Sequence, residues 1–115
     1  MMVAAALLLA GAAPSSSAVA GYYETHQMEV AAGLELQPDG HFRYALDYGA
    51  VSEATQGDWS FDGTLVRLTS NPMPPELHAL ELGNARFDHE LLLLKDGDLL
   101  LERYETVFRF QRVEP

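Results

Sequence analysis

The stretch from Leu34 to Thr69, LELQPDGHFRYALDYGAVSEATQGDWSFDGTLVRLT, decides the fold. Two turn signals separate runs of alternating apolar and polar residues, a pattern typical of two consecutive β-hairpins. In the first hairpin, Pro38 presets the backbone for a turn and Gly40 supplies a left-handed conformation, which predicts a three-residue loop. Pairing outward from this loop brings Glu35 opposite Arg43, an outward pair of opposite charge.

The second hairpin is expected at Asp62-Gly63, because this dipeptide is among the strongest short signals for a tight hairpin turn. A two-residue turn there pairs Asp58 with Arg67 on the outside and directs Trp59 inward. A slip of one residue would turn Trp59 to solvent. Residues 49–56, between the two hairpins, have no clean period and are expected to form a loop with frayed strand ends.

Strand signals also occur on both sides of this stretch. Residues 21–30 contain strand formers and predict the first strand, followed by a weak spot or bulge at 31–33. Residues 106–113 alternate cleanly and predict the last strand, and pairing of the last strand with the first would remove the free edges. About seven or eight short strands with regular turn signals predict an all-β fold, either a small antiparallel meander barrel or a flattened barrel or sandwich.

A third hairpin is centred on Asp96-Gly97, where a two-residue turn pairs Lys95 with Asp98. The flanking runs 91–94 and 99–101 are leucine-rich and do not alternate, so both faces are apolar near the turn. Either both faces are covered, or the Leu91–Leu101 hairpin presents apolar surface to another molecule.

Prolines interrupt the chain before this hairpin. The segment 71–75 reads NPMPP, and its prolines cannot donate to a strand ladder, so it is expected to cross an end or edge of the structure. The next segment, 76–82, fits either a short strand or one helical turn, and we favour the strand.

Residues 1–20 have the features of a secretory signal peptide. The apolar run Val3–Ala13 is too short to cross a bilayer as a helix, and Ala18-Val19-Ala20 is a small-x-small cleavage pattern. We therefore expect cleavage after Ala20, a periplasmic or secreted location, and a single domain formed by residues 21–115. An uncleaved anchor or a core helix is the alternative interpretation of the apolar run.

The composition limits the partners of this domain. The formal net charge of the 115-residue chain is −10, which argues against binding to nucleic acid or to anionic lipid. The same acidity keeps a secreted protein soluble. The chain has no cysteine, so strand pairing and packing must hold the fold without disulfides.

No motif in the sequence indicates catalysis. The four histidines lack metal-ligand spacing, and the chain has no phosphate loop, no G-x-S-x-G and no cysteine nucleophile. Two carboxylates converging in a cleft would indicate a glycosidase-like site, but Asp58 and Glu90 have expected cross-strand partners, Glu90 with Arg103. We therefore expect no catalytic residue, no metal and no cofactor. The carboxylates considered are Glu24, Asp47, Glu53, Asp58, Glu90 and Glu102.

The aromatic residues are the remaining candidates, because strand parity directs most of them to one interior. A packed core is one interpretation. The other is a small apolar or amphipathic ligand held at the barrel mouth, where tyrosine hydroxyls would supply polar contacts. The candidate ligand-binding residues are Tyr23, Tyr44, Tyr48, Trp59 and Phe108.

The order of these motifs resembles small secreted bacterial lipocalin-like β-barrel domains, among them the N-terminal barrel of envelope copper-resistance lipoproteins. The resemblance covers roughly Gly21 to Thr69 and implies a lipocalin-like barrel. The chain lacks the CxxC that those lipoproteins carry after the first tyrosine, which speaks against a metal-stress role. The motifs are Gly21-Tyr22-Tyr23-Glu24, Leu34-Glu35-Leu36, Pro38-Asp39-Gly40, Phe42 with Tyr44, Gly57 with Trp59, and Val66 with Leu68.

These observations lead to three functional hypotheses. The first is a non-catalytic periplasmic or secreted binding module for a small apolar or amphipathic molecule at the barrel mouth. The second is a protein-interaction module of the cell envelope that uses the Leu91–Leu101 hairpin, with the protein a monomer or weak homodimer. The third is an enzyme of unknown type. A cavity would favour the first hypothesis, and a filled core with an exposed apolar hairpin would favour the second.

Overall fold

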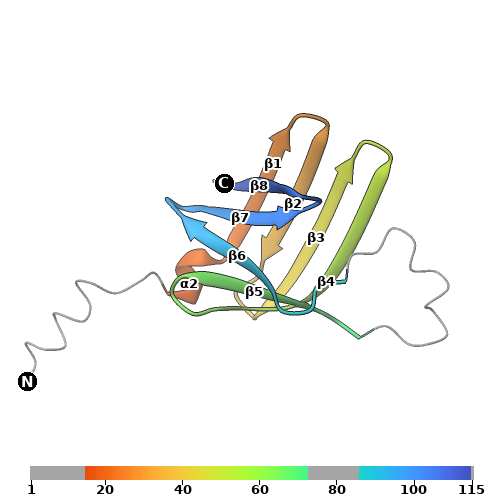
Figure 1. Ribbon diagram of the computed structural model, residues 1–115. Helices are drawn as coiled ribbons and strands as arrows, with labels where there is room; N and C mark the ends of the chain where they lie inside the picture. Colours follow the sequence, from red (N-terminus) through yellow and green to blue (C-terminus); the bar gives the residue numbers. More distant parts are fainter. Residues whose placement is uncertain (1–14, 73–85, 115) are drawn as a thin grey trace, which may run out of the picture.

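The computed structural model describes residues 15–72 and 86–114. Within these ranges the strands form a closed antiparallel barrel, in which each strand pairs with the next along the chain and β8 pairs with β1 (Figure 1). A short helix, α2 (Ser16–Val19), precedes the first strand. The strands are β1 (Gly21–Gln27), β2 (Val30–Leu36), β3 (His41–Tyr48), β4 (Val51–Phe61), β5 (Leu65–Ser70), β6 (Glu90–Lys95), β7 (Asp98–Arg103) and β8 (Thr106–Val113).

This architecture confirms the prediction of a small antiparallel meander barrel, including the pairing of the first strand with the last. Tyr22 faces Val113 and Glu24 faces Gln111 across the closing seam. Among the described residues, no helix has the length and apolarity needed to span a bilayer. The expected short element at 76–82 lies outside the described residues.

The turns predicted from glycine are present. In the β2–β3 hairpin, Glu35 faces Arg43 as predicted, and Gly40 has a φ of +95°. In the β6–β7 hairpin, Lys95 faces Asp98 across the turn at Asp96-Gly97. These turns could be located because glycine adopts a positive φ without steric strain.

The register predicted for the β4–β5 hairpin was wrong by two residues, since Arg67 faces Ser60 rather than Asp58. The Asp62 carboxylate accepts hydrogen bonds from two backbone N–H groups that follow it, at 2.9 and 2.8 Å, and so holds a longer loop than a two-residue turn. A shift of two residues preserves the face on which each side chain lies. Trp59 is therefore buried as predicted.

The prediction of one strand over residues 21–30 was also wrong. The segment turns at Met28-Glu29, so β1 and β2 form a hairpin and the expected bulge at 31–33 is regular strand. Glu29 occupies the positive-φ position of this turn, with a φ of 59°. Because no glycine marks the turn, the sequence pattern did not reveal it.

The predicted loop at 49–56 is mostly strand. Only Gly49-Ala50 forms the turn, and β4 pairs with β3 along its whole first half. Strand alternation along β4 buries Glu53 and Trp59 on the inner face. The inward positions 53, 55 and 57 are a glutamate, a threonine and a glycine, which is why the pattern looked like a loop.

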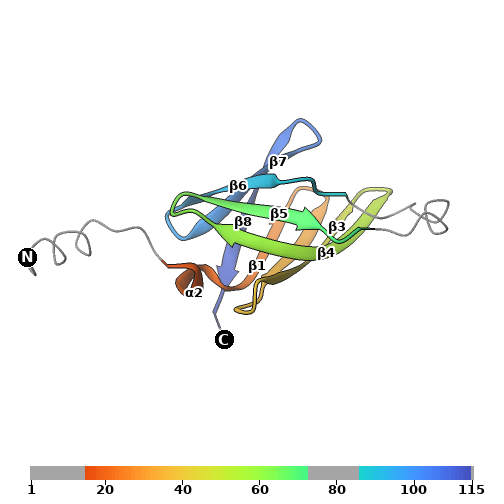
Figure 2. The same ribbon diagram turned by 90° about the horizontal axis from the view of Figure 1, so that it is seen from below.

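The interior-facing side chains of all eight strands form one core. The two ends of this core differ (Figures 1 and 2). At one end α2 lies beside the start of β1, and its Val19 is buried in the core. At the opposite end lie the β1–β2, β3–β4 and β7–β8 turns, together with the buried ring of Phe87. The largest fully buried side chains are Tyr23, Leu34, Leu36, Phe42, Leu46, Val66, Leu68, Leu92, Leu99, Leu101, Phe108 and Phe110.

Candidate functional site

The barrel end opposite α2 contains a buried carboxylate, Glu53, which is 8% exposed. Its Oε2 accepts hydrogen bonds from Arg103 Nε at 2.6 Å and from the Tyr44 hydroxyl at 2.9 Å. Its Oε1 accepts from Arg103 Nη2 at 2.8 Å and from the Tyr104 hydroxyl at 2.6 Å. We call Glu53, Arg103, Tyr44 and Tyr104 the polar clamp, since they join β3, β4, β7 and the β7–β8 turn across the interior.

Aromatic rings surround the cation of the polar clamp. The guanidinium carbon of Arg103 lies 5.2 Å from the Phe87 ring centroid and 5.1 Å from that of Tyr104. Both distances suit a cation–π contact. Phe87 in turn packs on Tyr44, with ring centroids 4.8 Å apart. The ion pair is therefore enclosed by protein groups on several sides.

The electrostatics keep the polar clamp ionised. Burial raises the pKa of Glu53, but hydrogen bonds from Arg103, Tyr104 and Tyr44 outweigh burial and hold that pKa below its usual value. The hydrogen bonds to Glu53 raise the pKa of Arg103, and burial raises the pKa of Tyr44. An ionised carboxylate with four donors has little capacity to take up a proton at neutral pH. The clamp therefore suits structural closure better than general acid–base chemistry.

The β7–β8 turn holds Tyr104 in an unusual backbone conformation. Tyr104 and Glu105 have φ values of 55° and 61°, in the left-handed region that favours glycine and asparagine. Non-glycine residues persist there when surrounding contacts compensate for the strain. The hydrogen bond to Glu53 and the edge contact with Tyr48, at 5.9 Å between ring centroids, supply such contacts. Tyr104 is still 44% exposed.

The five residues predicted to bind a ligand do not form one site. Tyr44 belongs to the polar clamp, and Tyr48 packs beside it against Phe108, with ring centroids 6.0 Å apart. Tyr23 and Trp59 lie toward the other end of the barrel. There the Tyr23 hydroxyl donates to the Val19 carbonyl at 2.6 Å, and Trp59 Nε1 donates to the Gln37 carbonyl at 2.8 Å.

Sequence reasoning missed the roles of Glu53 and Arg103. Arg103 was expected on the outer surface opposite Glu90, whereas its side chain points inward to Glu53. The alternation of inward and outward positions along each strand would have revealed both residues. Arg103 is in phase with the buried Leu99 and Leu101, just as Glu53 is in phase with the buried Trp59.

The outer surface of β5, β6 and β7 carries a second candidate site. Leu65 faces Leu93 across the β5–β6 pair, and Leu93 faces Leu100 across the β6–β7 pair, so the three leucines form a row across the sheet. Leu91 lies two residues along β6 from this row. Leu91 and Leu93 are 43% and 39% exposed, and Leu65 and Leu100 are half-buried. We call these four residues the leucine face.

Charged residues border the leucine face asymmetrically. Arg67 faces Leu91 from the β5 side and is exposed. On the β7 side lie the exposed Glu102 and the half-buried Asp98, whose Oδ2 accepts from Arg109 Nε on β8 at 2.7 Å. One side of the face is therefore basic, and the opposite side carries the acidic groups.

The histidines of the described residues pair with neighbouring carboxylates at the surface. His26 Nε2 lies 3.1 Å from Glu24, and His41 Nδ1 lies 3.0 Å from Asp58. Within residues 15–72 and 86–114, no three groups of the kind that ligate metals come together.

The fold and both candidate sites therefore define a small closed antiparallel β-barrel with a polar clamp at one end and a leucine face outside. Comparison with protein-family models, curated proteins and solved structures finds no match. The function is therefore inferred from this chain's own geometry.

Proposed function

We propose that this protein is a non-catalytic interaction module that binds another protein through the leucine face, and that this partner is a second copy of the same chain. The observation that carries the proposal is the row Leu65, Leu93, Leu100 across three strands, with Leu91 beside it. A contiguous set of apolar side chains on an outer sheet face is typical of a surface that another molecule covers.

The filling of the barrel supports an outer rather than an inner binding surface. Inward-facing leucine, tyrosine and phenylalanine side chains of the strands pack into one core. Val19 covers this core at one end, and the polar clamp crosses it at the other. In the described part of the chain, every buried side-chain nitrogen and oxygen has a hydrogen-bond partner, so the interior presents no unpaired polar group to a ligand.

The charges around the leucine face favour a second copy as the partner. A two-fold axis parallel to β6, lying between two facing sheets, turns the β5 side of one copy over the β7 side of the other. Leu65 then approaches Leu100 of the second copy, and Arg67 approaches Glu102. This arrangement is electrostatically complementary, although the net charge of each chain is −10.

The lysine beside the face does not oppose this arrangement strongly. The axis brings Lys95 near its counterpart in the second copy, but each Lys95 also faces Asp98 within its own β6–β7 hairpin. Opposite charges directly across two strands offset part of such a repulsion.

The size of the leucine face predicts a weak dimer. Four leucines, two of them half-buried, offer a few hundred Å² per copy, well below the roughly 800 Å² per partner of a standard stable interface. The corresponding Kd is expected in the range of about 10 μM to 1 mM. Salt should weaken the dimer modestly, because only the rim contacts are ionic.

Sedimentation equilibrium over a series of protein concentrations tests this proposal. The unmodified protein is expected to show a reversible monomer–dimer equilibrium, and Leu93→Lys is expected to abolish it. The matched control is Val51→Lys, which adds the same charge at an exposed apolar position on β4, away from the leucine face. A strict monomer at all concentrations, or equal dimerisation of both variants, would contradict the proposal. If a photo-cross-linker at position 93 captures a different protein, that protein and not a second copy would be the partner.

A second candidate function is the binding of a small amphipathic molecule at the barrel mouth. The observation that favours it is the strained β7–β8 turn, which holds the half-exposed Tyr104 over the Glu53 carboxylate. A ligand there would compete for Tyr104 and contact Tyr48. Native mass spectrometry of protein exported by a bacterial host tests this candidate. Extra mass that harsh ionisation removes would support it, and a bare chain mass would contradict it.

A further inference from the structure

We infer that Ser15–Ala20 remains attached to the mature barrel as a permanent cover over one end, so that a leader peptide is removed N-terminal to Ser15 and not after Ala20. This inference is independent of the proposed function. It replaces the cleavage position expected from the small-x-small pattern at 18–20 with one upstream, and it follows from how closely the segment is built into the fold.

The segment has its own local structure. The Ser15 side chain caps α2 by accepting a hydrogen bond from the Ala18 backbone N–H at 3.3 Å. A four-residue helix is too short to persist by itself, so packing must stabilise it. Val19 supplies that packing, because it is 2% exposed and belongs to the same core as the strand residues.

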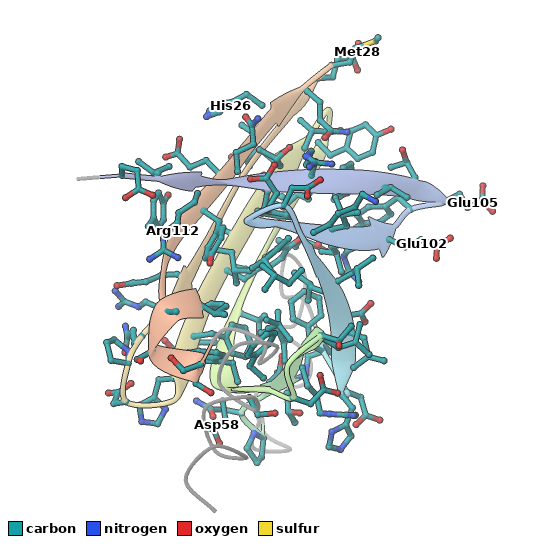
Figure 3. The ribbon with its side chains drawn as sticks, turned by 90° about the vertical axis from the view of Figure 1, so that its left-hand side faces the viewer. His26, Met28, Asp58, Glu102, Glu105 and Arg112 are labelled. Carbon is teal, nitrogen blue, oxygen red and sulfur yellow. The ribbon has the colours of Figure 1, made fainter. Side chains whose placement is uncertain are left out.

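Barrel side chains bind three consecutive carbonyl groups of this segment. Arg112 on β8 donates from Nη1 to the Ala18 carbonyl at 2.8 Å and from Nη2 to the Ala20 carbonyl at 2.7 Å. The fully buried Tyr23 donates its hydroxyl to the Val19 carbonyl at 2.6 Å. Figure 3 shows Arg112 and α2 on the same side of the barrel. Cleavage after Ala20 would leave the buried Tyr23 hydroxyl without this acceptor.

Cleavage after Ala20 would also create an unfavourable charge. The guanidinium of Arg112 lies against Gly21, with Nη2 3.0 Å from the position a Cβ would occupy. A chain that began at Gly21 would carry its positively charged α-amino group beside this guanidinium. Like charges on neighbouring groups repel each other. In the intact chain the same position is a neutral peptide group.

The sequence offers a cleavage pattern upstream. Ala10-Gly11-Ala12 also has small residues at the two positions that a leader peptidase reads, and it lies within the C-terminal part of the apolar run. The two patterns are equivalent by sequence. The contacts of Val19, Tyr23 and Arg112 distinguish them, because only the upstream site leaves Ser15–Ala20 on the folded domain.

Two measurements test the inference. The first is the intact mass of the full chain after export by a bacterial host. A mature chain that has lost its leader and starts at or shortly before Ser15 is expected, and a chain that starts at Gly21 or retains the whole leader would overturn the inference. Leader peptidases cleave before the chain folds, so the cleavage position alone does not measure what the segment contributes to stability. The second measurement therefore compares the melting temperatures of purified chains that start at Ser15 and at Gly21.

The chain that starts at Gly21 is expected to melt roughly 10 °C lower, because it loses a buried valine and the hydrogen bonds of Tyr23 and Arg112. The variant Val19→Ser in the longer chain should show part of this shift, whereas Ser16→Ala, at an exposed position of the same helix, should melt like the unmodified protein. Equal melting temperatures for the two chain lengths would overturn the inference.

Discussion

Replacing Glu53 by Gln tests whether the polar clamp stabilises the barrel. The amide retains one acceptor oxygen but turns the other into a donor that faces Arg103 or a tyrosine hydroxyl. At least two hydrogen bonds to a charged group are lost, each worth about 1.5–3 kcal/mol. Breaking a buried ion pair costs about 3–5 kcal/mol, and the partial exposure of the Arg103 side chain, 22%, lowers that figure. Glu53→Gln should therefore reduce the free energy of unfolding by about 2–4 kcal/mol.

The pH dependence gives this prediction a second readout. The pKa of Glu53 is lower in the folded protein than its ordinary value of about 4.3, so the folded state binds fewer protons than the unfolded state near that pH. The carboxylate therefore contributes its full stabilisation above the ordinary pKa and loses it as the pH falls through the folded-state pKa. The difference between the unmodified protein and Glu53→Gln should be constant near pH 7 and shrink below about pH 4.

Urea unfolding followed by fluorescence measures both effects, because Trp59 is the single tryptophan and is buried. Glu102→Gln is the matched control, since Glu102 is an exposed carboxylate on β7 next to Arg103. It should change stability by less than about 0.5 kcal/mol. A loss below about 1 kcal/mol for Glu53→Gln, or the same pH profile in both proteins, would refute the role assigned to the clamp.

Two further substitutions test the packing of the barrel. Trp59→Ala should cost about 3–5 kcal/mol of unfolding free energy, because the indole is buried and donates to the Gln37 carbonyl. Unfolding of this variant can be followed by circular dichroism. A loss under about 1 kcal/mol would show that Trp59 is not a core residue. Gly57→Ala should cost at least about 2 kcal/mol, since the new Cβ would overlap the backbone carbonyl oxygen of Thr69 and force β4 away from β5. Ser60→Ala on the same strand is the neutral control. Equal stability of the two variants would contradict this close approach.

The elements that could be predicted from the sequence are those with a local cause. Gly40 and Gly97 mark turns because they take positive φ values, and the opposite charges of Glu35 and Arg43 agree with the register that the turn imposes. The Met28-Glu29 turn could not be predicted, because a glutamate occupies its left-handed position. For the β4–β5 hairpin the predicted inner face was correct, but the predicted cross-strand partners were wrong, since the Asp62 side-chain carboxylate lengthens the loop.

The polar clamp depends on contacts that no local pattern contains. Glu53 and Arg103 are 50 residues apart in the chain and meet only because the closed barrel brings β4 and β7 across one interior. A charged residue at an inward strand position interrupts the apolar alternation, so each looked like a surface residue or a loop. The pair could have been suggested from the sequence, because two residues of opposite charge at inward positions of different strands can meet in the interior of a barrel.

The cover over the other barrel end illustrates the same difficulty. Ala18-Val19-Ala20 is small and apolar, which fits a cleavage pattern and a core contact equally well. Only the positions of Tyr23 and Arg112 on β1 and β8 distinguish these interpretations. Arg112 is 94 and 92 residues away from the two carbonyl groups that it binds, so no local pattern contains this contact.

Nuclear magnetic resonance of ¹⁵N-labelled protein over a dilution series tests whether the filled barrel pairs with its own copy through the leucine face. We expect concentration-dependent amide shifts that map to the outer positions of β5, β6 and β7, with Leu65, Leu93 and Leu100 at their centre. Amides around Val19 and the polar clamp should not change. Shifts that are independent of concentration, or that map to Tyr48 and Tyr104 at the barrel mouth, would contradict this pairing.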